Sequence, residues 1–280
     1  MEASEPQPQR LAELVSAPPA GTIERWAWDY VLSATLDAKL SPPPVPEVWE
    51  AAPPVRRLEA PGRPPELRIV QKAAKTRGLQ SEHGRARALH TFLHHELQAA
   101  ELMAWAVLAY PSTPVEFRAG LVRIALDEIR HMHLYAKEIV RLGHALGDFT
   151  VRDWFWERIP SCVDAASFVA AMGLGFESAN LEHTAAYAAR FRAAGDEQGA
   201  RVQEIIGLEE IAHVRFGARW FQTFTGELAF ARWKAALPAP LSPMLMRGRP
   251  LHREARRRAG QSETFLDELD AWQPDDLPGS

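Results

Sequence analysis

The sequence contains very little cysteine and no long hydrophobic run. Cys162 is the only cysteine among 280 residues, which excludes an internal disulfide and favours an intracellular protein. No apolar run approaches the roughly 18 residues that a membrane-spanning helix needs. The first ten residues, MEASEPQPQR, are polar and unlike a secretory signal. We therefore expect a cytoplasmic protein without a membrane partner.

The charge balance also lacks a strong excess of one sign. The formal net charge of −4 gives no overall attraction to nucleic acid or to anionic membranes. One segment, RGRPLHREARRR at 247–258, is strongly basic and could contact RNA phosphates. We favour the alternative, a tail helix whose charges are solvated or paired within the protein.

Proline and helical periodicity divide the chain into three parts. Nine prolines between residues 41 and 66 exclude a helix there and predict an extended segment. We therefore expect an N-terminal helix and a proline-rich wrapping arm over 1–85. Helical periodicity dominates 86–225, and a tail with short helices follows over 226–280.

The central region predicts an all-α fold built from four long helices. Thr113 and Pro114 are expected to begin the second helix, and Asp196 to cap the fourth. Short turns join the first helix to the second and the third to the fourth, so each pair forms an antiparallel hairpin. The roughly 20 residues between the hairpins are long enough to cross a bundle. This order predicts a ferritin-like four-helix bundle, in which two hairpins are joined by a long crossover.

Two Glu-x-x-His motifs lie in the second helix of each predicted hairpin. They are Glu128–His131 and Glu210–His213. About one such spacing is expected by chance, so the number alone gives weak support. Their placement is more informative, because Glu96 precedes Glu128 by 32 positions and Glu177 precedes Glu210 by 33. Both midpoints fall at the predicted turns, so each hairpin brings a lone glutamate level with a motif.

Four carboxylates and two imidazoles in a helical bundle form the ligand set of di-iron and di-manganese carboxylate proteins. Unpaired buried carboxylates repel one another, and two divalent cations remove that repulsion. An oxygen-rich set with two imidazoles suits iron or manganese, with zinc as a further candidate. We predict two iron ions, with manganese or a mixed pair as alternatives. The predicted ligands are Glu96, Glu128, His131, Glu177, Glu210 and His213.

A second pair of glutamates competes for the same role. Glu101 and Glu182 also face largely apolar neighbours, and they precede Glu128 and Glu210 by 27 and 28 positions. Residues five apart on a helix differ by about 140°, so Glu96 and Glu101 cannot both reach one cluster. The turn midpoints favour Glu96 and Glu177, and the rival pair stays open as an alternative.

Other polar residues near the motifs are candidates for supporting roles. Asp127 and Glu209 each lie four positions before a motif histidine. Carboxylates often hold a metal-bound imidazole by its other N–H, although a solvated helix face is an equal alternative for Glu209. His90 and His94 lack the second motif histidine of a zinc-protease helix, so we expect them to be supporting, packed or surface residues.

Several segments together resemble an uncharacterised bacterial ferritin-like family, classed as a domain of unknown function. They are HHELQAAEL, DEIRHM, GDF, LEEIAHVRFGARWF and REARRRAG, and the likeness covers most of the chain. The resemblance implies a ferritin-like fold with a di-metal centre on the six residues above, and it supplies no substrate. More distantly, the pattern is similar to rubrerythrins and tRNA-hydroxylating di-iron enzymes. The first motif resembles that of bacterial multicomponent monooxygenases, but the second departs from it with Glu209 in place of aspartate.

From this cluster we expect an oxidoreductase that activates dioxygen or peroxide at a di-iron centre. The expected partners are an unidentified small-molecule or RNA substrate and an electron donor, and the chain is compatible with an oligomer. Three alternatives stay open. They are a ferroxidase or iron-storage protein, a tRNA-modifying hydroxylase, and a non-catalytic helical scaffold whose core polar groups pair with each other.

Overall fold

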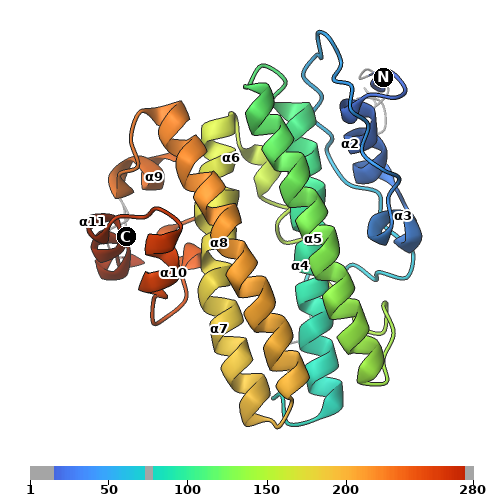
Figure 1. Ribbon diagram of the computed structural model, residues 1–280, viewed down its shortest axis with the longest axis vertical. Helices are drawn as coiled ribbons and strands as arrows, with labels where there is room; N and C mark the ends of the chain where they lie inside the picture. Colours follow the sequence, from blue (N-terminus) through green and yellow to red (C-terminus); the bar gives the residue numbers. More distant parts are fainter. Residues whose placement is uncertain (1–15, 73–77, 275–280) are drawn as a thin grey trace, which may run out of the picture.

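The computed structural model describes residues 16–72 and 78–274, so the N-terminal MEASEPQPQR segment lies outside the described residues. Within these ranges the fold is all-helical, with two isolated β-bridges. No described helix is both long enough and apolar enough to cross a membrane. Four long helices lie side by side in Figure 1. They are α4 (Glu82–Ala109), α5 (Val115–Arg141), α7 (Glu177–Ala193) and α8 (Glu197–Thr225).

Short turns connect α4 to α5 and α7 to α8, and each pair packs together as a hairpin. The predicted cap of α8 is confirmed, because the Asp196 side chain accepts a hydrogen bond from the Gly199 N–H at 3.0 Å. The predicted start of α5 at Thr113 and Pro114 agrees with the structure, but Thr113 does not cap the helix. Pro114 occupies the N-cap without a side-chain hydrogen bond, and the Thr113 hydroxyl donates to the Tyr110 carbonyl at 2.7 Å instead. The threonine therefore closes the preceding turn.

The third predicted helix contains an internal irregularity. It begins as α6 (Ala165–Ala171), which Asp164 caps, passes through the π-helical turn η2 (Met172–Phe176), and continues as α7. Gly173 in η2 lies against Gly217 in α8, where an added Cβ would come within 2.8 Å of the Gly217 Cα. A π-turn widens the helix locally and is common beside functional residues. This one ends directly before Glu177.

The connection between the hairpins runs from the end of α5 to α6 and includes η1 (Ile159–Ser161). It lies against α4, where the Gln98 side-chain oxygen accepts from the Phe155 N–H at 3.0 Å. This contact places Trp154 and Phe155 beside the middle of α4.

Segments before and after the four long helices cover opposite sides of the molecule (Figure 1). On one side lie α2 (Ile23–Leu32), α3 (Leu36–Leu40) and the proline-rich segment. The indole N–H of Trp105 in α4 donates to the Leu58 carbonyl of that segment at 3.0 Å. On the other side lie α9 (Phe230–Ala236), η3 (Pro243–Met246), α10 (Arg253–Arg258) and α11 (Glu263–Ala271).

Candidate metal centre

The six predicted ligand residues lie together between the four long helices. Their ligand atoms form two groups, and within each group one atom per residue lies within 4.8 Å of the others. Glu128 and Glu210 belong to both groups. The first group is completed by Glu96 and His131, and the second by Glu177 and His213. This is the arrangement in which two carboxylates can be shared between two neighbouring cations.

The six side chains are buried and their polar atoms face one another. His131 Nδ1 lies 3.1 Å from Glu128 Oε2, and His213 Nδ1 lies 3.2 Å from Glu210 Oε2. His213 Nδ1 also lies 2.9 Å from Glu128 Oε1, but not in hydrogen-bond geometry. Glu128 Oε1 is therefore buried without a hydrogen-bond partner among the described residues. A buried acceptor without a donor is costly, and a cation would remove that cost.

The pKa shifts within the cluster also favour the binding of cations. Burial, followed by the neighbouring Glu128, raises the pKa of Glu96 well above its usual value. Burial and then Glu210 raise the pKa of Glu177 in the same way. Burial also opposes ionisation of Glu128, but His131 and His213 together lower its pKa. Without a positive charge at the centre, Glu96 and Glu177 therefore resist ionisation.

Each imidazole is held from behind by a carboxylate of the other hairpin. His131 Nε2 of α5 lies 2.8 Å from Glu209 Oε2 of α8, and His213 Nε2 of α8 lies 3.3 Å from Asp127 Oδ2 of α5. These contacts agree with the expectation that Asp127 and Glu209 each hold a motif histidine by its far ring nitrogen, and each carboxylate contacts the histidine of the facing helix. Residues four apart on one helix lie side by side, whereas the facing helix can point a carboxylate at the far ring nitrogen.

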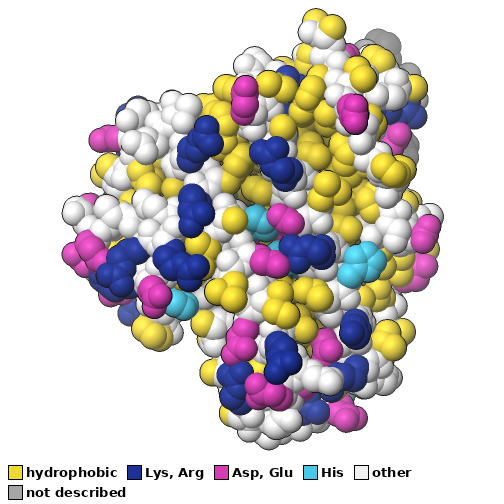
Figure 2. Space-filling model, viewed as in Figure 1, with side chains coloured by type: hydrophobic (Ala, Val, Ile, Leu, Met, Phe, Trp, Pro, Cys, Tyr) yellow, Lys and Arg dark blue, Asp and Glu magenta, His cyan; other side chains and the backbone are white. Residues whose placement is uncertain are grey.

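Arg130 joins the two supporting carboxylates at the surface. Its guanidinium donates to Glu209 Oε1 at 3.0 Å and to Asp127 Oδ1 at 3.2 Å. Charged side chains of both signs gather beside a histidine at the middle of this face in Figure 2. Sequence reasoning missed Arg130, although its place inside the first Glu-x-x-His motif was a signal.

The rival glutamate of α4 has a structural role instead. Glu101 is fully buried and forms ion pairs with Lys39 of α3 at 2.7 Å and with Arg63 of the proline-rich segment. The indole N–H of Trp156 also donates to Glu101 at 2.8 Å. These contacts neutralise Glu101 away from the cluster and fix the N-terminal segment against α4.

Glu182 of α7 has the corresponding role for the C-terminal tail. Arg256 of α10, which is fully buried, donates to both Glu182 oxygens at 2.8 and 2.7 Å. The Gly248 and His252 N–H groups donate to the same carboxylate. Elsewhere in the basic segment, Arg253 and Arg257 pair with acidic residues of α11. The structure therefore agrees with the expectation that charges of segment 247–258 are paired within the protein.

His90 and His94 lie outside both groups. His94 Nε2 lies 2.9 Å from Asp153 Oδ1, and His90 Nε2 accepts from the Gly147 N–H at 2.9 Å. Both histidines therefore hold the crossover against α4.

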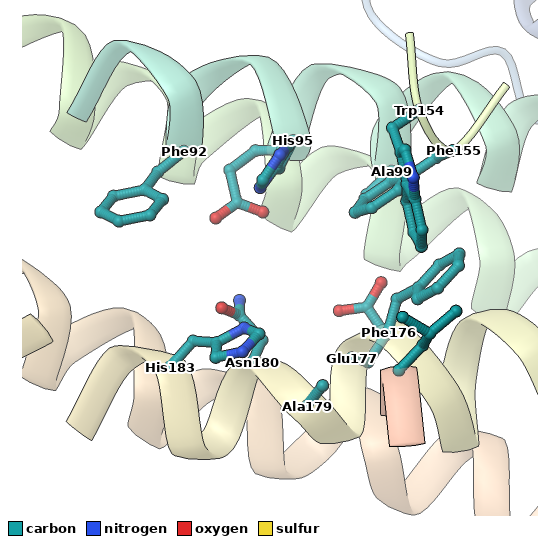
Figure 3. A pocket seen from close by; sticks show the side chains of 12 residues that line it. Phe92, His95, Ala99, Trp154, Phe155, Phe176, Glu177, Ala179, Asn180 and His183 are labelled. Carbon is teal, nitrogen blue, oxygen red and sulfur yellow. The ribbon is translucent and has the colours of Figure 1, made fainter. Parts of the chain in front are cut away.

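A cavity between α4 and α7 reaches the cluster. Its volume is about 230 Å³, and Glu96 and Glu177 form part of its wall. Figure 3 shows Glu177 and Asn180 of α7 facing Phe92 and His95 of α4 across this space. The Asn180 amide, which sequence reasoning missed, donates to Glu210 Oε1 at 3.0 Å. Its position three residues after Glu177 on one helix face was the available signal.

The fold and this site define an all-helical protein with a buried cluster of four carboxylates and two histidines. The chain belongs to the family described as "Protein of unknown function (DUF455)", whose model matches residues 24–267. It is 25% identical over 167 residues to an "Uncharacterized protein" of Haemophilus influenzae (strain ATCC 51907 / DSM 11121 / KW20 / Rd). That match covers 57% of this chain and 58% of the relative, so it spans little more than half the length of that protein. No solved structure matches the chain significantly.

Proposed function

We propose that the protein is a ferritin-like di-metal carboxylate oxidoreductase that uses two iron ions. The observation that carries the proposal is the pair of ligand groups sharing Glu128 and Glu210. Two hairpins joined by a long connection, with ligands from all four long helices, are also typical of ferritin-like di-metal proteins. Manganese or a mixed pair would suit the same oxygen-rich set.

The donor set fits two cations on three independent grounds. A buried oxygen of Glu128 lacks a hydrogen-bond donor among the described residues. Glu96 and Glu177 have raised pKa values that a nearby cation would reverse. Both histidines turn Nδ1 toward the carboxylates, while Nε2 is held by a carboxylate from behind. Supporting contacts of this kind fix the ring orientation of metal-bound histidines.

Two bound iron ions would supply redox chemistry with dioxygen or peroxide. The chain's own residues would set the geometry and the access. Asp127 and Glu209 would orient the imidazoles, and Asn180 would hold Glu210. The aromatic residues of the cavity would limit water beside Glu96 and Glu177.

Metal titration tests the proposal directly. Metal-free protein should bind two Fe²⁺ per chain under anaerobic conditions, and admitting oxygen should change the absorption spectrum as iron is oxidised. The double variant Glu128→Ala, His213→Ala should lose both effects, because it removes a shared ligand and an imidazole. Failure of the parent protein to take up iron or manganese would refute the proposal and favour a non-catalytic scaffold.

Iron oxidation for storage is the main competing function. A storage protein needs a closed shell of many subunits, which size-exclusion chromatography would separate from a small oligomer. The aromatic cavity beside Glu96 and Glu177 favours an organic substrate over mineral storage, because mineral iron needs no apolar binding site. Elution as a large cage that retains many iron atoms per chain would reverse this preference.

A further inference from the structure

The walls of the cavity between α4 and α7 are largely aromatic. Phe155 and Phe176 stack with their ring centroids 4.6 Å apart and their planes at 10°. Trp154 lies 5.1 Å from Phe176, and His95 stacks on Phe155 at 5.2 Å. Aromatic side chains favour planar apolar partners through offset or edge contacts. Figure 3 shows Trp154, Phe155 and Phe176 gathered at one end of the space, beside Glu177.

The volume limits the size of the occupant. An apolar cavity of about 150 Å³ is large enough to bind benzene. The cavity here measures about 230 Å³, which leaves room for one ring with a short substituent. Ala99 of α4 and Ala179 of α7 keep this space open, because both contribute only a methyl group to the wall.

The polar groups of the cavity limit the charge of the occupant. Its described lining contains no lysine or arginine, so a carboxylate or phosphate would lack a counter-charge and would face Glu96 and Glu177. A cationic molecule would have no free anion once these two carboxylates bind metal. His95, His183 and Asn180 provide ring nitrogens and an amide for a neutral polar group. His183 is exposed, so the cavity meets the surface near it.

We infer that this cavity binds an uncharged molecule with one aromatic ring and a small polar substituent such as a hydroxyl. The ring packs against Phe155 and Phe176, and the substituent is directed to the imidazoles of His95 and His183. The inference rests on the proposed function, because only a di-metal centre at Glu96 and Glu177 would make the bound ring a substrate.

Binding of 4-fluorophenol, followed by fluorine NMR, tests the inference with both metal-free and metal-loaded protein. We expect saturable binding that is at least about tenfold tighter than that of 4-fluorobenzoate, which has the same ring and a negative charge. Ala179→Phe should weaken 4-fluorophenol binding by about tenfold or more, which corresponds to about 1.4 kcal/mol. Ala189→Phe, at an exposed position on the same helix outside the cavity, should leave it unchanged.

Three outcomes would overturn the inference. They are the absence of saturable 4-fluorophenol binding, equal or tighter binding of the benzoate, and unchanged affinity in Ala179→Phe. Ala99→Leu fills the same cavity from α4 and replaces Ala179→Phe in the experiment if that variant does not fold. Metal content is measured separately on each sample, so loss of the proposed di-metal function is distinguished from loss of the cavity as a binding site.

Discussion

Buried glutamates five residues apart have different roles in this protein. Glu96 faces the cluster, whereas Glu101 on the same helix is neutralised by Lys39 and Arg63. The difference follows from helix geometry, because five residues turn the side chain by about 140°. Burial alone therefore does not identify a ligand in this helix.

Substitution of these two glutamates should have opposite effects. Glu96→Gln should reduce bound metal from two ions towards one per chain, because Glu96 belongs to one of the two groups. Glu101→Gln should keep both ions but lower the free energy of unfolding by about 3–5 kcal/mol, since the buried Lys39 loses its charged partner. Arg63 keeps its ion pair with Asp153. Elemental analysis and urea unfolding measure the two quantities. The reverse pattern would show that Glu101 is the ligand.

The carboxylates behind the imidazoles should tune metal affinity. Asp127→Asn should weaken metal binding by about 10–100-fold, because it removes the charged acceptor at His213 Nε2. Competition with a chelator of known affinity measures this change. Glu204→Gln provides the control, since Glu204 is exposed on α8 and pairs with Arg192. Equal affinity in Asp127→Asn and the parent would contradict a supporting role.

At the scale of helices, the α6–η2–α7 element combines an irregular turn with close packing. Glycines at 173 and 217 let η2 approach α8 backbone to backbone. Met172–Phe176 adopts a π-turn directly before Glu177, so this segment fixes the direction in which α7 begins.

Gly173→Ala should therefore destabilise the protein. The new methyl group would meet Gly217 backbone, which cannot move as a side chain can, and the expected cost is about 1–3 kcal/mol. Thermal unfolding should show a fall of about 2–4 °C for each kcal/mol. Gly78→Ala is the control, because no atom of the described residues lies within 4 Å of its added Cβ. Equal melting temperatures for the two variants would show that η2 has room to shift.

Sequence periodicity predicts the long helices, but it does not predict their internal irregularities or the contacts between them. The long helices and Asp196 as a cap are predicted because turn residues and apolar spacing act locally. The π-turn is not predicted, because spacing along one helix carries no information about the close approach of Gly173 to Gly217 of α8. The spacing indicated Asp127 and Glu209 as supports for the histidines, but it did not show that each carboxylate would contact the facing helix. Contacts between helices depend on rotations that spacing along one helix does not define.

At the scale of the whole molecule, the cluster links stability to pH. The pKa values of Glu96 and Glu177 are raised, first by burial and then by neighbouring carboxylates. Burial lowers the pKa values of His131 and His213, but Glu128 and Glu210 outweigh it and raise them overall. For all four groups, the folded protein without metal binds protons more tightly than the unfolded chain does.

The sign of the pH dependence follows from this difference. Stability rises with pH only where the unfolded chain binds more protons, so these four groups should contribute less stability to metal-free protein as the pH rises from about 5 to 8. Burial lowers the pKa values of His90, His94, His95 and His183, and these histidines contribute in the opposite direction. Metal-loaded protein should show a growing advantage over that range, because metal competes with protons for the same groups. Melting temperatures with and without metal measure both trends. The double variant Glu96→Gln, Glu177→Gln should make the metal-free slope of stability against pH more positive than that of the parent, because it removes two groups whose stabilising contribution falls as pH rises. An unchanged slope would contradict this origin.

The exchange of supports between α5 and α8 has a consequence for assembly of the site. Asp127 serves the imidazole of the later hairpin and Glu209 serves that of the earlier one. A peptide carrying either hairpin alone would therefore present a histidine with no anchor for its ring. If the cluster binds metal as proposed, neither hairpin alone would hold its histidine in the orientation needed, so the complete site would form only after the two hairpins have packed together.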